Sequence, residues 1–470
     1  MLPRIAALCV ATLICNTAAA RGASPYLPVA LSPEIERLVE RAMILADKPI
    51  LTRPIAAATV LDALPAVCAR DAALCEQIRR YLASYMQSGA LTHASLSLAS
   101  GSSEATTLRN RRGMRSDSAY ELSASLYWQP SDYLLVNAGF LAYEDDSVPA
   151  GTFVSFGVEH AQVDIGYRDH WFSPMTDSVM LIGTHAQTMP SITLSSYAPM
   201  TRLGLRYELF IAEMSESSRI AFGDGFTSGK PRLAGMHLSF EPLPGWAIGF
   251  NRIMQYGGGD RPDTFGDLLD AFLRPNERDN TGEGGDRDVE FGNQAASITS
   301  RFLVPGAVPF AVYFEYAGED TSKNSNVRLG NAALAGGVHF PSLWRGFDLT
   351  VELGEWQNAW YEHGIYQDGL RHENAVIGHW GGDLRVRGDG VGARSLMTRV
   401  GWQPRFGGAV EATYRALDNE AYTGIDYERA HSLEVRYSRS WRDFHFGAEI
   451  YLATDAFGES HSRAGAFIRF

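Results

Sequence analysis

The sequence predicts an all-β protein: a transmembrane antiparallel β-barrel of about 18 strands with a small N-terminal α-helical bundle. From about residue 90 onward, apolar and polar residues alternate with the period of a β-strand. The connections alternate between tight turns and long polar segments, an asymmetry typical of bacterial outer-membrane barrels. After the first 20 residues no apolar run is long enough for a transmembrane helix, so strands must make any membrane crossing.

Residues 1–20 have the features of a cleavable signal peptide. Arg4 provides a positive charge and an apolar stretch follows it. Small residues precede the expected cleavage point after Ala20, with Ala23 as the second choice. The sequence therefore predicts export.

Residues 21–89 are expected to form a helical bundle in the periplasm. Apolar residues at helical spacing predict three helices, which begin near Leu31, Arg53 and Ala72. We find no residue pattern in this segment that requires chemistry.

Cys68 and Cys75 are the two cysteines that lie outside the expected signal peptide. In an oxidising compartment a disulfide between them is the default expectation. A continuous helix would hold them about 10 Å apart, too far to bridge, so a turn is expected between them. Asp71 is the predicted N-cap of the helix that restarts there. A metal site built from these two cysteines is disfavoured, because no histidine lies nearby.

Residues 90–470 are predicted to form the barrel. An even strand number is typical of bacterial barrels, and the pattern yields eighteen segments. They lie near 90–101, 118–128, 131–143, 152–160, 162–168, 190–198, 203–214, 233–240, 246–256, 294–302, 309–318, 332–340, 348–356, 395–403, 408–416, 432–438, 442–453 and 463–470.

The orientation follows from the turns. With a periplasmic C-terminus, the short turns and the helical bundle face the periplasm and the long loops face outward. The last strand ends in Phe470, the kind of terminal aromatic residue that barrel-assembly machinery recognises. Outer-membrane lipids and lipopolysaccharide are therefore expected neighbours in the outer membrane of a Gram-negative bacterium.

Charge excludes one class of partner. The net charge is −13, near −14 without Arg4, which argues against nucleic acid. Nearly all basic residues are arginine, and coding bias is the favoured explanation. The alternative explanation is that planar guanidinium groups suit a polar lumen that contacts sugar hydroxyls and carboxylates.

Three loop clusters are candidates for binding. The loop 257–292 is rich in acidic residues and contains Arg261, and its segment Thr264–Leu273 has the spacing of an amphipathic helix. We expect this helix to pack at the barrel mouth as a lid or plug. The segment 356–394 contains Trp360, Tyr366 and Trp380, whose rings suit a sugar platform. The third cluster, 167–177, leaves a strand and enters an outer loop.

Catalysis and metal binding are disfavoured. The histidines of 356–394 fit no compact metal motif, and no cofactor is expected. No nucleophile motif occurs in a strained turn and no acid–base pair can be identified, which argues against a hydrolase.

At these loops the chain resembles the Wzi family of capsule-assembly proteins, which are outer-membrane lectins. The distinctive run is Asn251-Arg-Ile-Met-Gln-Tyr-Gly-Gly-Gly-Asp-Arg-Pro262, and shorter matches follow in family order. These shorter matches are Asp279-Asn-Thr-Gly282, Gly292-Asn-Gln294, Gly318-Glu-Asp320, Ile365-Tyr-Gln-Asp-Gly369 and Gly381-Gly-Asp383. The residues that carry the family motifs are Arg252, Gln255, Tyr256, Asp279, Asn280 and Asp383.

The resemblance implies an eighteen-stranded barrel, a periplasmic helical bundle, a largely occluded lumen and no catalytic activity. One residue resists the pattern: strict alternation puts Arg252 on the lipid face beside Phe250 and Met254. An arginine at mid-bilayer costs roughly 2–4 kcal/mol, so either a bulge or the border of the membrane band is expected there.

We therefore predict a non-enzymatic outer-membrane protein that binds capsular or exopolysaccharide and helps to assemble or anchor it at the cell surface. Arg261, Trp360, Tyr366 and Trp380 are the predicted ligand-binding residues, with aromatic faces for sugar rings and a guanidinium for carboxylates. The alternative is a diffusion porin for sugars, which would differ in having an open bore.

Overall fold

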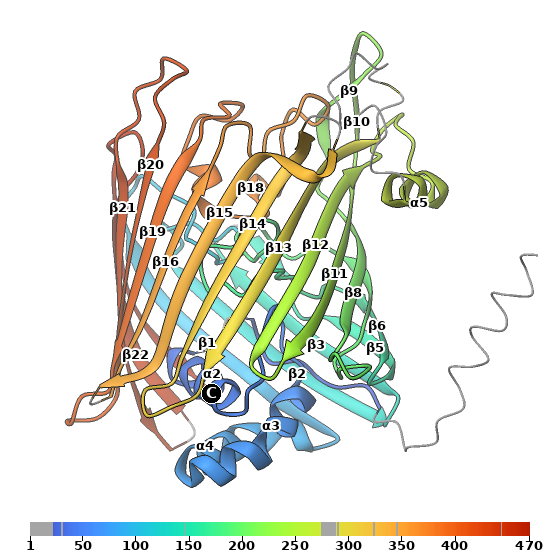
Figure 1. The fold of residues 1–470 in the computed structure, drawn as a ribbon. Coiled ribbons are helices and arrows are strands. Elements are labelled where there is room, and N and C mark those ends of the chain that lie inside the picture. Colours follow the sequence, from blue (N-terminus) through green and yellow to red (C-terminus); the bar gives the residue numbers. More distant parts are fainter. Residues whose placement is uncertain are drawn as a thin grey trace, which may run out of the picture.

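The computed structural model of the 470-residue chain describes residues 22–29, 32–144, 146–273, 288, 291–322, 325–344, 346–442 and 444–470. A closed antiparallel barrel of 18 strands dominates the fold (Figure 1), which confirms the predicted fold class. The barrel closes at β1 (Gly89–Gly101), which pairs with β2 (Tyr120–Ser131) on one side and β23 (Ser460–Arg469) on the other. A short extra strand, β4 (Asp146–Val148), pairs with β3 (Leu134–Tyr143).

Each predicted strand segment overlaps one strand of the barrel. The remaining barrel strands are β5 (Phe153–Val158), β6 (Ala161–Gly166), β7 (Ser191–Ser195), β8 (Arg206–Glu213), β11 (Arg232–Leu243), β12 (Trp246–Tyr256), β13 (Gly292–Val304), β14 (Phe310–Ser322), β15 (Ser325–Trp344), β16 (Phe347–Trp356), β19 (Ala393–Trp402), β20 (Ala409–Asn419), β21 (Ala430–Trp441) and β22 (Phe444–Thr454).

The strands alternate between lumen and exterior. In β12, Gly249 and Asn251 are buried in the interior, whereas Phe250 between them is 41% exposed on the outer face. This alternation is typical of a membrane barrel, in which one face of each strand contacts lipid and the other face contacts the polar interior. We call the end where tight turns connect the strands the short-turn end, and the opposite end, where the long connections lie, the long-loop end.

The N-terminal helices cover the short-turn end (Figure 1). They are α2 (Pro33–Leu45), α3 (Ala57–Arg70) and α4 (Ala72–Leu82), followed by the 3₁₀ turn η1 (Ser84–Met86). Among the described residues, no helix is both long and apolar enough to cross a membrane.

The boundary between α3 and α4 brings Cys68 and Cys75 together. The structure joins them by a disulfide, with their Cα atoms 4.9 Å apart. The chain can turn here because Asp71 ends α3 and caps α4, its carboxylate accepting a hydrogen bond of 2.9 Å from the backbone N–H of Leu74.

Buried ion pairs attach the bundle to the barrel wall. Glu40 of α2 pairs with Arg301 of β13 and, at 2.9 Å, with Arg53 of the α2–α3 connection. Arg37 of α2 pairs with Asp348 of β16 in the same way. Burial would raise the pKa of Glu40, but Arg301 and Arg53 outweigh it and lower that pKa to about 2. These buried ion pairs thus hold the helical bundle firmly against the end of the barrel.

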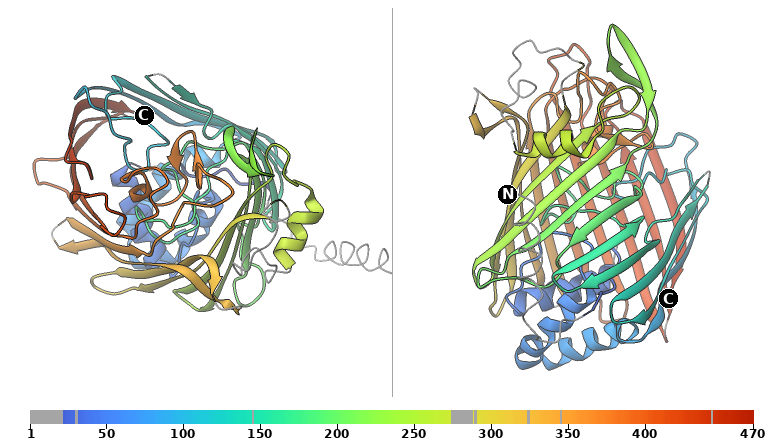
Figure 2. Two further views of the ribbon diagram at one scale, coloured as in Figure 1. Left: turned by 90° about the horizontal axis from the view of Figure 1, so that it is seen from above. Right: turned by 90° about the vertical axis from the view of Figure 1, so that its right-hand side faces the viewer.

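The predicted helix of the 257–292 loop exists, but it does not form a lid. Helix α5 (Phe265–Leu273) lies outside the barrel near the long-loop end, as both views of Figure 2 show. Its apolar partner is the outer face of the wall, where Leu268 packs with Ala234, Met254 and Tyr256. The expectation of a lid over the mouth is therefore wrong.

No β-bulge occurs at Arg252. The ladder between β11 and β12 is regular from Arg232 to Phe240, so Arg252 faces outward with Phe250 and Met254 as alternation requires. Of the two expected explanations, the bulge is excluded and the border of the membrane band stays a prediction.

The structure also contains a hairpin that the sequence did not predict. Strands β9 (Ser217–Phe222) and β10 (Gly225–Gly229) project from the long-loop end (Figure 1), within a segment expected to be an irregular polar loop. Its local alternation is short, and no barrel strand pairs with it in the part of the chain that the structure describes.

Candidate functional site

Two connections fold inward and fill the barrel. They are residues 167–190, between β6 and β7, and residues 357–392, between β16 and β19, and together we call them the plug. Seen from above, the plug occupies the centre of the ring of strands (Figure 2). Its largest side chains are almost wholly buried, among them Phe172, Trp360, Tyr361, Tyr366 and Trp380.

The wall holds the first plug segment through a lumen-facing carboxylate. Glu352 of β16 is fully buried and accepts hydrogen bonds of 2.7–3.1 Å from the backbone N–H groups of Thr176, Asp177 and Ser178. The hydroxyl of Thr176 donates a further bond of 2.9 Å to it. A carboxylate saturated by backbone donors is a strong, directional anchor.

Asp177 joins both plug segments to the wall. Its carboxylate accepts a hydrogen bond of 2.7 Å from Arg415 of β20 and one of 2.9 Å from the indole N–H of Trp380. Burial would raise the pKa of Asp177, but Arg415 outweighs burial and lowers it.

Asp383, one of the family-motif residues, makes a second junction inside the plug. His185 accepts from a backbone N–H through Nδ1, so its Nε2 carries the proton and donates to Asp383 at 2.9 Å. Burial would raise the pKa of Asp383, but His185 and Arg371 outweigh it and lower that pKa to about 2. The glycines before Asp383 are required by close packing, since a Cβ on Gly382 would lie 2.7 Å from the ring of Tyr361.

A polar pocket lies above the plug at the long-loop end, and we call it the loop-end pocket. Its volume is about 450 Å³ with its open mouth included. Buried side chains of Gln255, Tyr366 and Arg371 form the floor, and the exposed Glu216 and Arg387 belong to the rim. The other lining residues are Met214, Ser215, Ser217, Pro231, Asp368, Gly369 and Asn374.

The pocket presents donors and acceptors side by side. Asp368 lies 3.6 Å from both Arg219 and Arg387 and accepts a hydrogen bond of 2.6 Å from the Ser217 hydroxyl. Burial lowers the pKa of His372, beneath this rim, to about 4, so at neutral pH the local cations are arginines. Sugar hydroxyls both donate and accept, so this mixed lining suits a carbohydrate better than a purely anionic or cationic ligand.

The four predicted ligand-binding residues are all buried. Trp360, Tyr366 and Trp380 expose 1% or less of their surface and Arg261 exposes 3%, so none presents an open face to a sugar. The expectation of exposed ring faces is therefore wrong, because the loop that contains the three aromatics folds inward. Tyr366 alone of the four lines the loop-end pocket, and its hydroxyl donates to the carbonyl of Gly257 at 3.0 Å.

The family-motif residues lie in different parts of the structure. Gln255 is part of the floor of the loop-end pocket and donates to the carbonyl of Gly369 at 3.3 Å, whereas Tyr256 faces outward and stacks on Phe291. Asp279 and Asn280 lie outside the described residues. The rim residues Glu216 and Arg387 were not predicted, because a charged residue in a polar loop has no distinguishing pattern in sequence.

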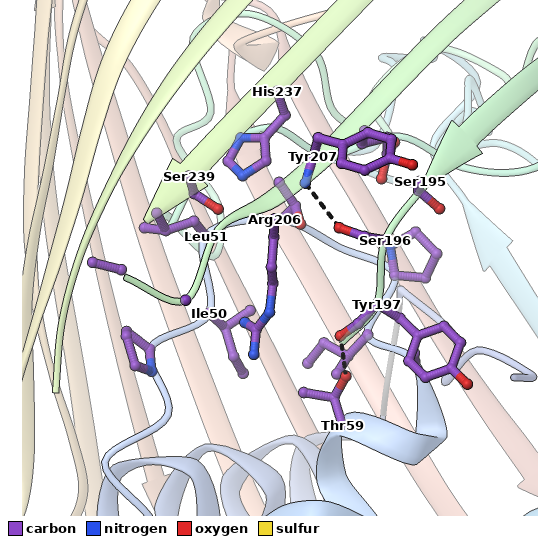
Figure 3. A pocket seen from close by; sticks show the side chains of 18 of the residues that line it. Ile50, Leu51, Thr59, Ser195, Ser196, Tyr197, Arg206, Tyr207, His237 and Ser239 are labelled. Atoms are coloured by element: carbon purple, nitrogen blue, oxygen red, sulfur yellow. Dashed lines mark hydrogen bonds between the residues drawn. The ribbon is translucent and has the colours of Figure 1, made fainter. Parts of the chain in front are cut away.

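A second pocket, of about 730 Å³ with its open mouth included, lies at the short-turn end between the wall and the bundle (Figure 3). Arg206 runs across it toward Ile50, and Thr59 donates to the carbonyl of Tyr197 at 3.3 Å. The guanidinium of Arg206 and the carboxylate of Glu241 form a long ion pair, 3.8 Å apart. This pocket and the loop-end pocket are at opposite ends of the barrel.

The described part of the chain contains no group of three or more His, Cys, Asp or Glu side chains able to hold a metal ion. The clusters of ionisable groups found above are ion pairs and hydrogen-bonded anchors within the plug or at its wall. Their geometry accounts for occlusion of the barrel.

The family model described as capsule assembly protein Wzi matches residues 86–386. A protein from the cps region of Klebsiella pneumoniae, described as an uncharacterized 55.8 kDa protein, is 34% identical over 104 residues, which cover 21% of this chain. That match spans only 19% of the relative's own length. The solved structure of Wzi, described as an outer membrane protein involved in group 1 capsule assembly in Escherichia coli and as a carbohydrate binding β-barrel, has a similar fold. Its TM-score is 0.69 at 12% identity, over 96% of this chain and 99% of that one.

Proposed function

Because the chain belongs to the Wzi family of capsule assembly proteins, we propose that it binds a surface polysaccharide at the loop-end pocket without catalysis. The protein then helps to assemble or anchor a capsular or exopolysaccharide at the cell surface. The observation that supports this most is an open polar pocket of mixed donors and acceptors on top of a filled barrel.

The plug favours binding over transport. A diffusion porin needs a continuous aqueous path, and here Trp360, Trp380 and Tyr361 are buried inside the ring of strands. A ligand that meets the outer end of the plug can be held there, but it has no evident route through it. The porin alternative therefore has less structural support.

The arrangement in the envelope belongs to the same proposal. The protein is an outer-membrane barrel, and we place the bundle and the short-turn end in the periplasm, so that the loop-end pocket faces outward. Residues 1–20 act as the signal peptide for export. The outer wall contacts membrane lipid and lipopolysaccharide, and the last strand with Phe470 is the part presented to the barrel-assembly machinery.

Rim residues provide the cleanest test. Alanine at Trp360 or Trp380 would disturb the plug, so lost binding would not identify a contact. Arg387 is exposed, and Arg387→Ala removes a rim donor with little effect on packing. We expect it to weaken binding of the producer's own polysaccharide about 5–10-fold, which corresponds to the loss of one ordinary hydrogen bond of about 1 kcal/mol.

The matched control is Arg394→Ala. Arg394 is an exposed arginine of β19 that pairs with Glu355 and does not line the pocket. Binding can be measured with purified protein on immobilised polysaccharide, and retention of the polysaccharide on cells gives the second readout. Equal affinity of Arg387→Ala, Asp368→Asn and the parent protein would remove the loop-end pocket from the binding site. Unchanged retention in cells without the protein would contradict the function itself.

A further inference from the structure

Helix α5 packs one apolar face against the outer wall of the barrel. Leu268 and Ala271 are buried, and Leu268 and Phe272 pack with Ala234 of β11 and Met254 of β12. Both strand residues lie on the outward side of their strands, since their neighbours Gly235 and Ile253 are buried in the lumen. The helix therefore lies on the surface that the other strands turn toward lipid.

Both ends of α5 are held by specific hydrogen bonds. At the N-terminus, the Thr264 hydroxyl accepts from the backbone N–H of Asp267, and the Asp267 carboxylate accepts from the backbone N–H of Thr264, which is a capping box. At the C-terminus, the guanidinium of Arg252 donates to the carbonyls of Ala271 at 3.0 Å and Phe272 at 3.3 Å. These caps fix a helix of nine residues at one place on the wall.

Two further apolar residues of α5 are exposed and lie side by side. Phe265 is 70% exposed and Leu269 is 45% exposed, and residues four apart lie on one face of a helix. Exposed apolar side chains continue below the helix on the outward faces of neighbouring strands, at Leu209, Leu238 and Phe250. The outer face of α5 is therefore continuous with the apolar belt of the barrel.

The height of α5 places it at the border of that belt. Exposed aromatic residues such as Phe302, Trp344 and Trp441 ring the short-turn end, where β12 begins at Trp246. From Trp246 to Met254, under the helix, a strand tilted by 35–45° climbs roughly 20 Å. The apolar band of such barrels is about 25 Å tall, so α5 lies near its far edge.

We propose that α5 is an interfacial lipid anchor. Phe265 and Leu269 insert into the hydrocarbon of the leaflet on the long-loop side, with the helix lying in the plane of the interface. These two residues are continuous with the lipid-facing wall, and the side chains of Phe265 and Leu269 offer no hydrogen-bond donor or acceptor to a sugar. In the orientation proposed above, that leaflet is the outer one, whose lipid carries lipopolysaccharide.

Arg252 lies beneath the C-terminal end of α5. Its aliphatic stem lies on the outer wall, and its guanidinium is satisfied by helix carbonyls and by the side chain of Gln294. The charge thus sits at the band border, bonded to the C-terminus of α5, where a cation is favourable to the helix dipole.

Site-specific quenching tests the anchor. Single variants Phe265→Cys and Leu269→Cys carry a bimane label, and the labelled full chain is reconstituted into phosphatidylcholine vesicles with or without bromine on the upper acyl carbons. We expect brominated lipid to lower the emission at both positions by about half, since an interfacial helix buries its apolar face 5–10 Å into the boundary. The parent protein, with Cys68 and Cys75 bonded to each other, gives the labelling blank.

Two matched positions calibrate the result. Phe250→Cys in the belt, 41% exposed, should be quenched, and Phe226→Cys in the projecting hairpin, 63% exposed, should not. Folding of each variant is checked by the heat-dependent gel migration of an assembled barrel. Labels at 265 and 269 that behave like the one at 226 would overturn the proposal. The proposal would also be overturned if bromine left the emission unchanged while the protein-to-lipid ratio altered it. That result would mean that the exposed residues of α5 contact a second copy of the protein. Neither readout depends on polysaccharide binding.

Discussion

The carboxylate of Asp177 and the guanidinium of Arg415 form a buried ion pair, 2.7 Å between Oδ1 and Nη2, that fastens the plug to strand β20. Asp177 also accepts from Trp380 of the second plug segment, so one side chain joins both segments to the wall. Buried polar contacts of this kind therefore contribute to holding the plug in the barrel beside its apolar packing, and each can be tested by substitution.

The first prediction concerns conductance. Purified protein in a planar bilayer should conduct poorly, because the plug fills the barrel. Asp177→Ala removes the shared acceptor and leaves Arg415 with a buried, partly uncompensated charge, a change that costs about 3–5 kcal/mol. We expect frequent channel openings in this variant. The exposed pair Arg394–Glu355 supplies the control, since its removal should leave the current at the parent level. A large steady current from the parent protein would instead support the porin alternative.

The second prediction concerns acid. The folded-state pKa of Glu40 is about 2, below its ordinary value of 4.5, so its stabilising contribution is present above pH 4.5 and is lost as pH falls toward 2. That contribution is roughly 3 kcal/mol. The protection factors of amides in α2 and α3, corrected for the intrinsic exchange rate at each pH, should fall over this range, while those of the barrel strands stay unchanged. Glu40→Gln should show fast exchange already at pH 7 and no further acid step, and an acid step that survives in this variant would assign the titration to another group.

The third prediction concerns the disulfide. The Cys68–Cys75 loop is short and local, so its removal should cost the bundle roughly 2–3 kcal/mol and leave the barrel assembled. The variant Cys68→Ser/Cys75→Ser should therefore be cut faster by protease in α3 and α4, with unchanged heat-dependent gel migration. Free alkylation of both cysteines in protein extracted without reductant would show that the bond does not form in the envelope.

The fourth prediction concerns Arg252. Arg252→Gln shortens the side chain and removes its charge, so the carbonyls of Ala271 and Phe272 lose their donor. We expect α5 to detach from the wall more often, and a bimane label at residue 269 should lose most of its quenching by brominated lipid. Arg252→Lys keeps the charge but not the forked donor geometry, so it should restore part of the quenching. Full quenching in Arg252→Gln would mean that apolar packing alone holds the helix.

Local patterns predicted more of this fold than of its site. The eighteen segments, the three helices and the turn at Asp71 each depend on residues within one element or beside it, so alternation and capping were sufficient. The same reasoning found α5 but not its position, because its apolar residues at Phe265, Leu268, Leu269 and Phe272 predict a single buried face. The structure divides them between the wall and the exterior.

The candidate site required the tertiary structure. The segment 356–394 has the composition of a polar outer loop with aromatic residues, and nothing local distinguishes a loop that extends outward from one that folds inward. The direction is set by partners far away in sequence, such as Asp177 for Trp380 and Met180 for Tyr361.

The sequence by itself determined that this protein is a barrel with a helical end and long loops on the opposite side, because strand periodicity and turn length are encoded within short windows. Only the tertiary structure decided which loop residues are accessible. Trp360 and Trp380 are buried, while Arg387 and Glu216 remain at the rim of the loop-end pocket. The physical reason is that a loop folds inward only where the interior offers matching polar partners, and these partners lie far away in sequence. Glu352 is such a partner for Thr176 of the first plug segment, and Asp177 is one for Trp380 of the second.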